Sequence, residues 1–207
     1  MMLLSVLQSC STEDSTNNQN VVSSNSGIIE NDVYTNDYFD FSLPIPVEWK
    51  VITLDGEVSE FELDNAEKDH LTSKGAVDVH SKTLLEMEKK VHPDSAGIRI
   101  VFLSEDRSGI KHGAREYLEY AQQLMRDMDG NSEVRYEFGS IKSQSTIGGK
   151  DFLAQPVFFW NQGIKQAQMT YCQEFKDYLL VVVLSGFVSK AELAEAKAVL
   201  SAVEWGD

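Results

Sequence analysis

The stretch Tyr178-Leu179-Leu180-Val181-Val182-Val183-Leu184 decides the fold that this sequence predicts. It is the longest uninterrupted apolar run in the chain, so a strand built from it has two apolar faces. Such a strand is stable only at the centre of a sheet that is covered on both sides. The run is also far too short to cross a bilayer, which needs about 20 residues.

Turn signals next to this run predict that it belongs to a series of antiparallel hairpins. Gly148-Gly149 favours a two-residue hairpin turn, because both central positions need positive φ. Two further turns are predicted at Asn161-Gln162-Gly163 and at Lys176-Asp177. These turns separate predicted strands at 142–147, 151–160, 165–175 and 178–185.

The remaining segments alternate irregularly between strand and helix patterns. Apolar residues at steps of three and four predict a helix from Ala114 to Met128, and the capping box Ser189–Glu192 begins a second helix through Leu200. Further strands are predicted at 38–43, 49–54, 83–89, 98–104, 135–139 and 202–205, and a solvated helix is one interpretation of the acidic segment 55–69. Helices on both sides of a buried strand predict an α+β fold. We expect an α/β/α sandwich with a central, mostly antiparallel sheet of about six to seven strands.

Composition narrows the classes of function. The chain has 207 residues, 42% of them hydrophobic, and its formal net charge is −15. Such a length is sufficient for one domain with a buried core. The acidic balance repels the phosphates of nucleic acid, so no nucleic-acid partner is expected.

The N-terminus carries a lipoprotein-like pattern, Leu7-Gln8-Ser9-Cys10, with an aliphatic residue three positions before the cysteine and a small residue directly before it. Residues 1–10 are therefore interpreted as a truncated lipoprotein signal, with Cys10 as the lipidation site. No basic residue precedes Cys10, although secretory signals normally have one; either the natural start lies upstream or the match is accidental. Residues 11–32, largely small and polar, predict a disordered tether before one domain at 33–207.

The opening Tyr38-Phe39-Asp40-Phe41-Ser42-Leu43-Pro44, followed by Trp49-Lys50-Val51, resembles the start of PsbP-like domains. These are domains similar to the PsbP extrinsic protein of photosystem II and to the Ran-binding nuclear import factor that shares its fold. Matching segments at 114–118, 147–152, 168–171 and 203–205 span nearly the whole chain after the tether. The chain is also similar to uncharacterised secreted lipoproteins of Gram-positive bacteria. The resemblance implies the sandwich fold and a non-enzymatic binding or assembly role.

Candidate chemical groups are few. Cys172 follows Gln166, Gln168 and Thr170 on the more polar face of a predicted strand, so a small residue under a covering helix is preferred over a catalytic thiol. The four histidines, His70, His80, His92 and His112, lack the spacing of metal ligands, so neither a metal nor a cofactor is expected. Calcium binding by the acidic segment is less favoured than a solvated surface, because the ligand order of a calcium loop is missing.

Two functions follow from these observations. The first is a non-enzymatic, extracytoplasmic binding module that is anchored to the membrane by lipid on Cys10 and binds an unknown protein or small ligand. Trp160, beside a turn, and its neighbour Phe159 are its candidate interface residues. The alternative is a cell-envelope hydrolase that uses the loop residues His92 and Asp94.

Overall fold

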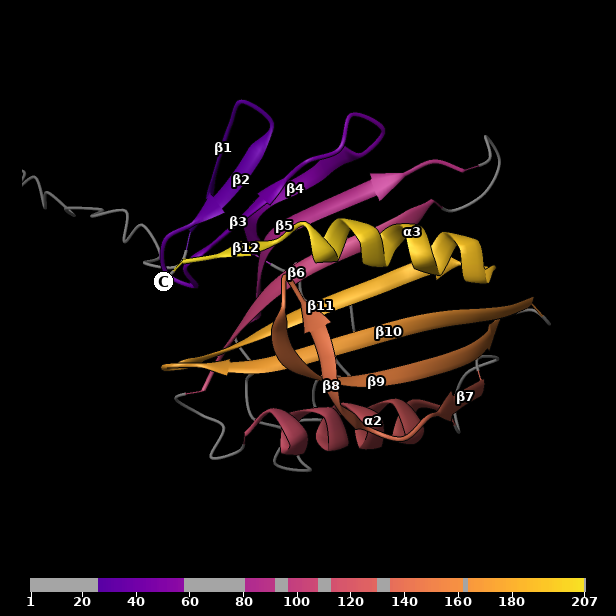
Figure 1. The fold of residues 1–207 in the computed structure, drawn as a ribbon. Helices are drawn as coiled ribbons and strands as arrows, with labels where there is room; N and C mark the ends of the chain where they lie inside the picture. The colour runs from indigo at the N-terminus through magenta and orange to yellow at the C-terminus, as the bar shows by residue number, and fades with distance from the viewer. Residues whose placement is uncertain are drawn as a thin grey trace, which may run out of the picture.

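A computed structural model describes residues 26–57, 81–91, 97–107, 113–129, 135–161 and 164–206, and Figure 1 shows how they are arranged. These residues form two antiparallel sheets and two helices. The smaller sheet has the order β1 (Ile28–Glu30), β2 (Val33–Asn36), β3 (Phe41–Pro44) and β12 (Glu204–Trp205). The larger sheet has the order β4 (Lys50–Glu57), β5 (Ser81–Lys89), β6 (Ile98–Asp106), β11 (Tyr178–Phe187), β10 (Ile164–Phe175), β9 (Lys150–Asn161) and β7 (Arg135–Phe138), and β8 (Lys142–Ile147) also pairs with β9. The helices are α2 (Ala114–Asp129) and α3 (Lys190–Ser201).

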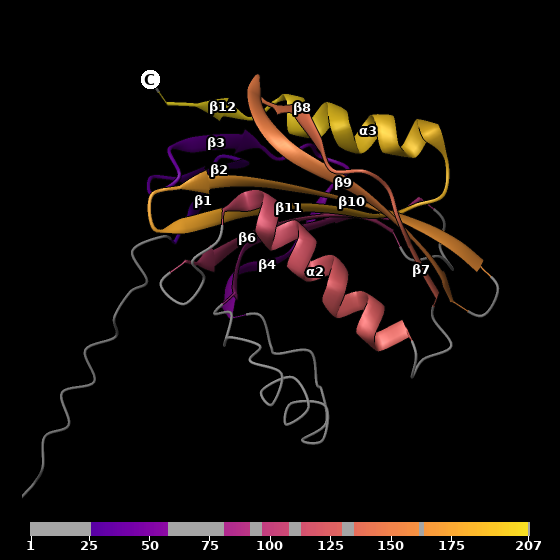
Figure 2. The same cartoon turned by 90° about the horizontal axis from the view of Figure 1, so that it is seen from below.

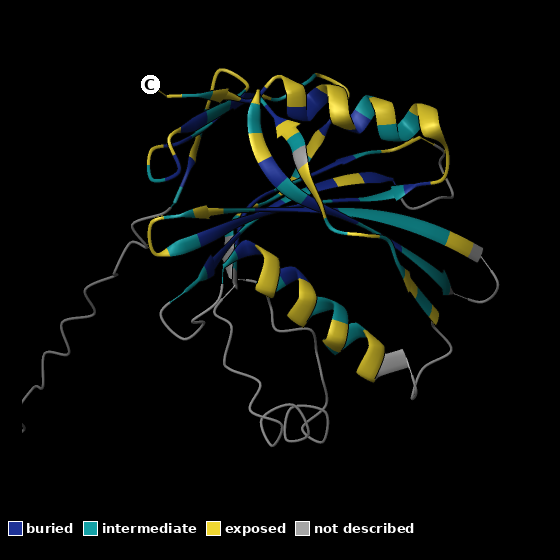
Figure 3. Ribbon diagram, turned by 60° about the horizontal axis from the view of Figure 1, so that its bottom comes forward, coloured by how far each residue is buried: buried dark blue, intermediate teal, exposed yellow. Residues whose placement is uncertain are grey.

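Strand β11 is central and buried on both faces, as the sequence predicts. It lies between β6 and β10. Leu180 and Val182 belong to the main core with α3 and the small sheet, whereas Leu179 and Val181 pack with residues of α2 in a second cluster. Figure 3 shows that both helices turn their buried residues toward the sheet.

The predicted α/β/α sandwich is wrong, because the molecule is mostly β. The four-stranded sheet fills most of the layer expected to be helical on one face, and it shares that layer with α3 (Figure 2). On the other face, α2 is the one helix among the described residues, and it contacts β7, β9 and β10. The larger sheet also has eight strands instead of six or seven.

The reason for this error is strand pairing, which periodicity does not reveal. The predicted strands at 38–43 and 202–205 do not join the main sheet but pair with each other, Glu204 with Ser42 and Trp205 with Phe41. The pair is held against the main sheet by rings, since Phe41 stacks on Phe102 of β6 with centroids 5.5 Å apart. The small sheet is therefore a separate layer of the core.

The predictions from local sequence, a hairpin turn and a helix cap, were more accurate than the predicted arrangement of layers. Gly148 and Gly149 have φ values of +54° and +82° in the β8–β9 turn, as the hairpin chemistry requires. A Cβ on Gly148 would lie 2.0 Å from the carbonyl oxygen of Val203, so close packing also demands glycine there. The capping box of α3 is present, with Ser189 Oγ accepting a hydrogen bond from the backbone N–H of Glu192.

The ordered fold begins before the boundary that we predicted at Val33. Residues 28–30, which we assigned to the tether, form the edge strand β1 and pair with β2. In the acidic segment interpreted as a solvated helix, residues 55–57 belong to strand β4, and residues 58–69 lie outside the described residues.

Burial on both faces of β11 predicts the effect of two neighbouring substitutions. Leu179→Ala and Leu180→Ala each remove a fully buried side chain from opposite sides of the strand. Each should lower the free energy of unfolding by about 2–5 kcal/mol in a denaturant titration, the usual cost of such cavities. Ile52→Ala on the edge strand β4, where the side chain is 44% exposed, is the control and should cost clearly less. A sheet buried on one face only would spare one of the two leucines.

Candidate binding site

A groove of about 360 Å³ lies where the first turn of α3 meets the β9–β10 hairpin. Its volume falls near the lower end of the range for small-ligand sites. Apolar side chains form most of its wall: Phe158, Ala167, Phe187, Val188 and Leu193. Its polar lining is Lys165, Gln166, Ser189 and Lys190.

Strand register places the groove residues on one face of the large sheet. Phe158 pairs with Ala167, and Trp160 pairs with Lys165, so these four side chains share the face that α3 covers. Ala167 also packs against the main core. Because its side chain is a single methyl group, Ala167 leaves space beside the ring of Phe158.

A bulge at the end of β11 completes the wall. The register with β10 shifts between Ala167–Phe187 and Met169–Leu184, and Gly186 within the shift has φ +76°. A Cβ on Gly186 would lie 2.1 Å from the carbonyl oxygen of Gly97, so only glycine fits. A bulge of this kind bends its strand, and Phe187 and Val188 beyond it line the groove.

Cations gather around the groove although the chain carries a net charge of −15. The Nζ atom of Lys165 lies 4.5 Å from the ring centroid of Phe158 and 4.7 Å from that of Trp160. On the other side of Trp160, the guanidinium of Arg135 lies 5.7 Å from its centroid. Lys190 is exposed in the first turn of α3. The groove therefore has ammonium groups at its rim and apolar residues inside.

Two carboxylates lie near these cations. Glu137 on β7 is the cross-strand partner of Phe158 and is exposed. Glu192 is engaged in the cap of α3, where its Oε2 accepts hydrogen bonds from the backbone N–H groups of Val188, at 2.6 Å, and Ser189, at 3.2 Å. The lining itself contains two lysines and neither aspartate nor glutamate.

The two predicted interface residues do not form one patch. Trp160 is half-buried on the groove side, beside Lys165 and Arg135. Phe159 points to the opposite face, where its ring lies 6.1 Å from that of Tyr136.

The sequence analysis missed two other residues of the groove, Val188 and Leu193. A hydrophobic staple could have indicated them, because Val188 directly precedes the N-cap Ser189 and Leu193 is the fourth residue after it.

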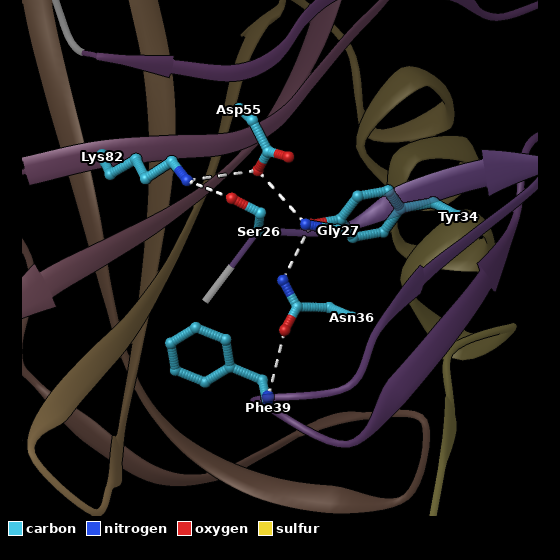
Figure 4. Close-up of polar contacts among 7 residues, drawn as sticks. All are labelled: Ser26, Gly27, Tyr34, Asn36, Phe39, Asp55 and Lys82. Atoms are coloured by element: carbon cyan, nitrogen blue, oxygen red, sulfur yellow. Dashed lines mark hydrogen bonds and ion pairs between the residues drawn. The ribbon is translucent and has the colours of Figure 1, made fainter. Parts of the chain in front are cut away.

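A polar network fastens the N-terminal segment to the body, as Figure 4 shows. The backbone N–H of the buried Gly27 donates to Asp55 Oδ1 at 3.2 Å, and Lys82 Nζ donates to Ser26 Oγ at 2.7 Å. Lys82 Nζ also forms an ion pair with Asp55 Oδ1, at 3.6 Å. The chain is thus tied to β4 and β5 of the large sheet before β1 begins.

Two buried side chains extend this network inside the small sheet. Asn36 donates from Nδ2 to the Tyr34 hydroxyl at 3.0 Å and accepts from the backbone N–H of Phe39 at 3.0 Å (Figure 4). Tyr34 is fully buried, and this burial raises its pKa well above the ordinary value. A Cβ on Gly27 would lie 2.3 Å from the Tyr34 hydroxyl oxygen, so the chain passes directly over that ring.

Cys172 is buried beneath α2, in a cluster with Ala114 and Leu118 of the helix. Burial raises the pKa of its thiol well above the ordinary value, and the carboxylates of Glu105 and Glu174 raise it further. A nucleophilic thiolate is therefore disfavoured at this position. The position agrees with the preferred interpretation from the sequence, a small residue under a covering helix.

Several candidate residues lie outside the described residues: Cys10, His70, His80, His92, Asp94 and His112. The hydrolase alternative depends on two of them and stays a prediction. Among the described residues, no group of three or more His, Cys, Asp or Glu side chains is arranged to hold a metal ion. Neither of the two described helices has the length and hydropathy needed to cross a membrane.

Comparison with known proteins gives a limited result. No protein-family model matches the chain, and no curated protein matches it. One similar solved structure is that of LpqN, which is involved in cell envelope biogenesis of Mycobacterium tuberculosis. The two chains are 12% identical with a TM-score of 0.44, and the match covers 81% of this chain and 83% of that one. A likeness at this level transfers neither a family nor a function, and the resemblance to PsbP-like domains is not confirmed.

The burial of Cys172 predicts its reactivity. In the full chain carrying Cys10→Ala, Cys172 is the sole cysteine. A disulfide reagent at pH 8 should leave it unlabelled in the folded protein, because the raised pKa keeps the thiol protonated and α2 covers it. Complete labelling is expected in guanidinium chloride. A second chain with Val188→Cys, at a site that is 75% exposed, should gain one rapidly reacting thiol. Rapid labelling of Cys172 in the native state would contradict the assignment.

Proposed function

We propose that this chain is an extracytoplasmic protein, held at the membrane by lipid on Cys10, that acts as a non-enzymatic binding module. The observation that carries the binding role is the groove between α3 and the β9–β10 hairpin, with apolar walls and lysines at its rim. Support for the location comes from Leu7-Gln8-Ser9-Cys10 and the polar segment that follows it.

The placement of the groove suits a tethered module. Strands β1 and β12 lie at one end of the molecule, and the first turn of α3 and the β9–β10 turn lie at the other (Figures 1 and 2). The chain enters the body at the β1 end, where Gly27 is held by Asp55. A module anchored through that end presents its groove away from the membrane.

Lipid anchoring predicts where the protein fractionates. When it is expressed from its natural start in a bacterial host, the unmodified chain should sediment with membranes, and Cys10→Ala should appear in the medium. Ser11→Ala is the matched control and should stay with the membranes. Unchanged fractionation of Cys10→Ala would exclude lipid on this residue as the anchor.

The binding role predicts a position-specific contact in intact cells. A photo-activatable phenylalanine analogue placed at Val188 on the groove, which is 75% exposed, should form an adduct with the bound partner. The same analogue at the exposed Ala198, on the outer side of α3 and outside the groove lining, is the matched control. Mass spectrometry of both chains should find an adduct at position 188 alone. Identical patterns at the two positions would remove the groove as the binding site.

A further inference from the structure

We propose that the groove binds a small amphiphilic anion, an alkyl or aryl chain that ends in a carboxylate or phosphate, and takes it as a free monomer. The inference rests on the proposed function and names the ligand class of the same site. It is carried by the chemistry of the lining, the charge of the surroundings and the place of the groove in the fold.

The interior of the groove requires an apolar ligand body. Phe158 and Phe187 contribute rings, and Val188 and Leu193 contribute branched aliphatic side chains. Val188 is 75% exposed and lies beside these apolar residues. An alkyl or aryl chain that covers it removes this apolar surface from water, which stabilises the complex. A bare inorganic anion would leave the same surface exposed.

The rim requires a negative charge on that ligand. Lys165 on β10 and Lys190 in the first turn of α3 both line the groove. The rings of Phe158 and Trp160 hold the Lys165 ammonium beside the apolar wall. A carboxylate or phosphate at the rim can accept charge-assisted hydrogen bonds from both lysines while its chain lies on the rings.

The charge of the whole chain gives this rim its selectivity. With a net charge of −15, most of the surface attracts cations and repels anions. Among the residues that the structure describes, Lys165, Lys190 and Arg135 form a local cluster of cations, Glu137 is an exposed carboxylate near them, and Glu192 is engaged in the cap of α3. A free anionic ligand is therefore favoured at this end of the molecule over most other surfaces.

The source of the ligand follows from the fold. A bilayer surface would also supply alkyl chains with anionic heads, but the groove lies at the end opposite β1, where the chain enters the body (Figure 1). Anchoring through that end turns the groove away from the membrane. We therefore assign the ligand to the free monomer and treat a vesicle as a test of the assignment.

The test uses the full chain with Cys10→Ala and isothermal titration calorimetry. Decanoate is the probe, decyltrimethylammonium supplies the same chain with the opposite charge, and inorganic phosphate supplies charge without a chain. Decanoate should bind, and the other two should bind at least tenfold more weakly. Trp160 fluorescence should change with decanoate, and Trp160→Phe should remove most of that change.

Paired variants separate this site from general electrostatics. Lys165→Gln with Lys190→Gln should weaken decanoate binding about tenfold or more, since hydrogen bonds to charged groups are among the stronger ones. Lys176→Gln with Lys197→Gln removes two exposed lysines elsewhere, one of them also on a ring, that of Tyr38, and should leave binding unchanged. Val188→Glu should abolish binding without unfolding the protein, because its side chain is exposed.

Several outcomes would overturn the inference. They are failure of decanoate to bind, equal loss of binding in both double variants, and phosphate binding as tight as that of decanoate. Sedimentation with phosphatidylglycerol vesicles that depends on Lys165 and Lys190 would assign the site to a bilayer instead. An adduct at position 188 in cells, combined with no binding of decanoate, would leave the binding module in place and exclude this ligand class alone.

Discussion

The two-sided burial of β11 is the constraint on which the rest of the structure depends. A strand with apolar side chains at every position from Leu179 to Val183 is stable only if water is excluded from both faces. The chain meets this requirement with α2 on one side and with α3 and the small sheet on the other. The other long strands are then arranged outward from β11, through β10 and β9 on one flank and β6 and β5 on the other.

The groove results from the unequal lengths of the covering elements. Strands β9 and β10 have 12 residues each and extend for about 40 Å at the usual rise per residue. Helix α3 also has 12 residues, but a helix of that length covers about 18 Å. The small sheet shares this face with α3, and near the β9–β10 turn Phe158 and Trp160 are only half-buried. The groove is a part of this face that the described residues leave partly exposed.

The sequence predicted features that depend on neighbouring residues and failed on those that depend on distant ones. The Gly148-Gly149 turn and the Ser189 cap were correct because φ preferences and first-turn hydrogen bonds are local. The pairing of Trp205 with Phe41 joins residues that are far apart in the chain, and no local pattern encodes it. Because of this pairing, a second sheet lies where the sequence predicted a layer of helices.

For the candidate site too, local sequence revealed some residues, and only the fold revealed the others. The aromatic residue Trp160 beside a turn was visible in the sequence, and the structure places it at the edge of the groove side. Lys165 and Phe187 were not singled out, because only strand register and the bulge at Gly186 bring them together. The cluster of cations at the groove could not be predicted either, because a net charge of −15 gives no indication that a few lysines become neighbours through folding.

Contacts to the large sheet hold the segment that precedes β1. Strand β1 is an edge strand with three pairs, and an edge strand alone is easily peeled from its sheet. Gly27 and Ser26, which precede it, are bonded to Asp55 and Lys82 on the other sheet. These contacts join the small sheet's first strand to the large sheet, and they precede the pairing of β1 with β2 along the chain. The network of Figure 4 therefore secures the edge strand β1 at the end of the fold opposite to the first turn of α3.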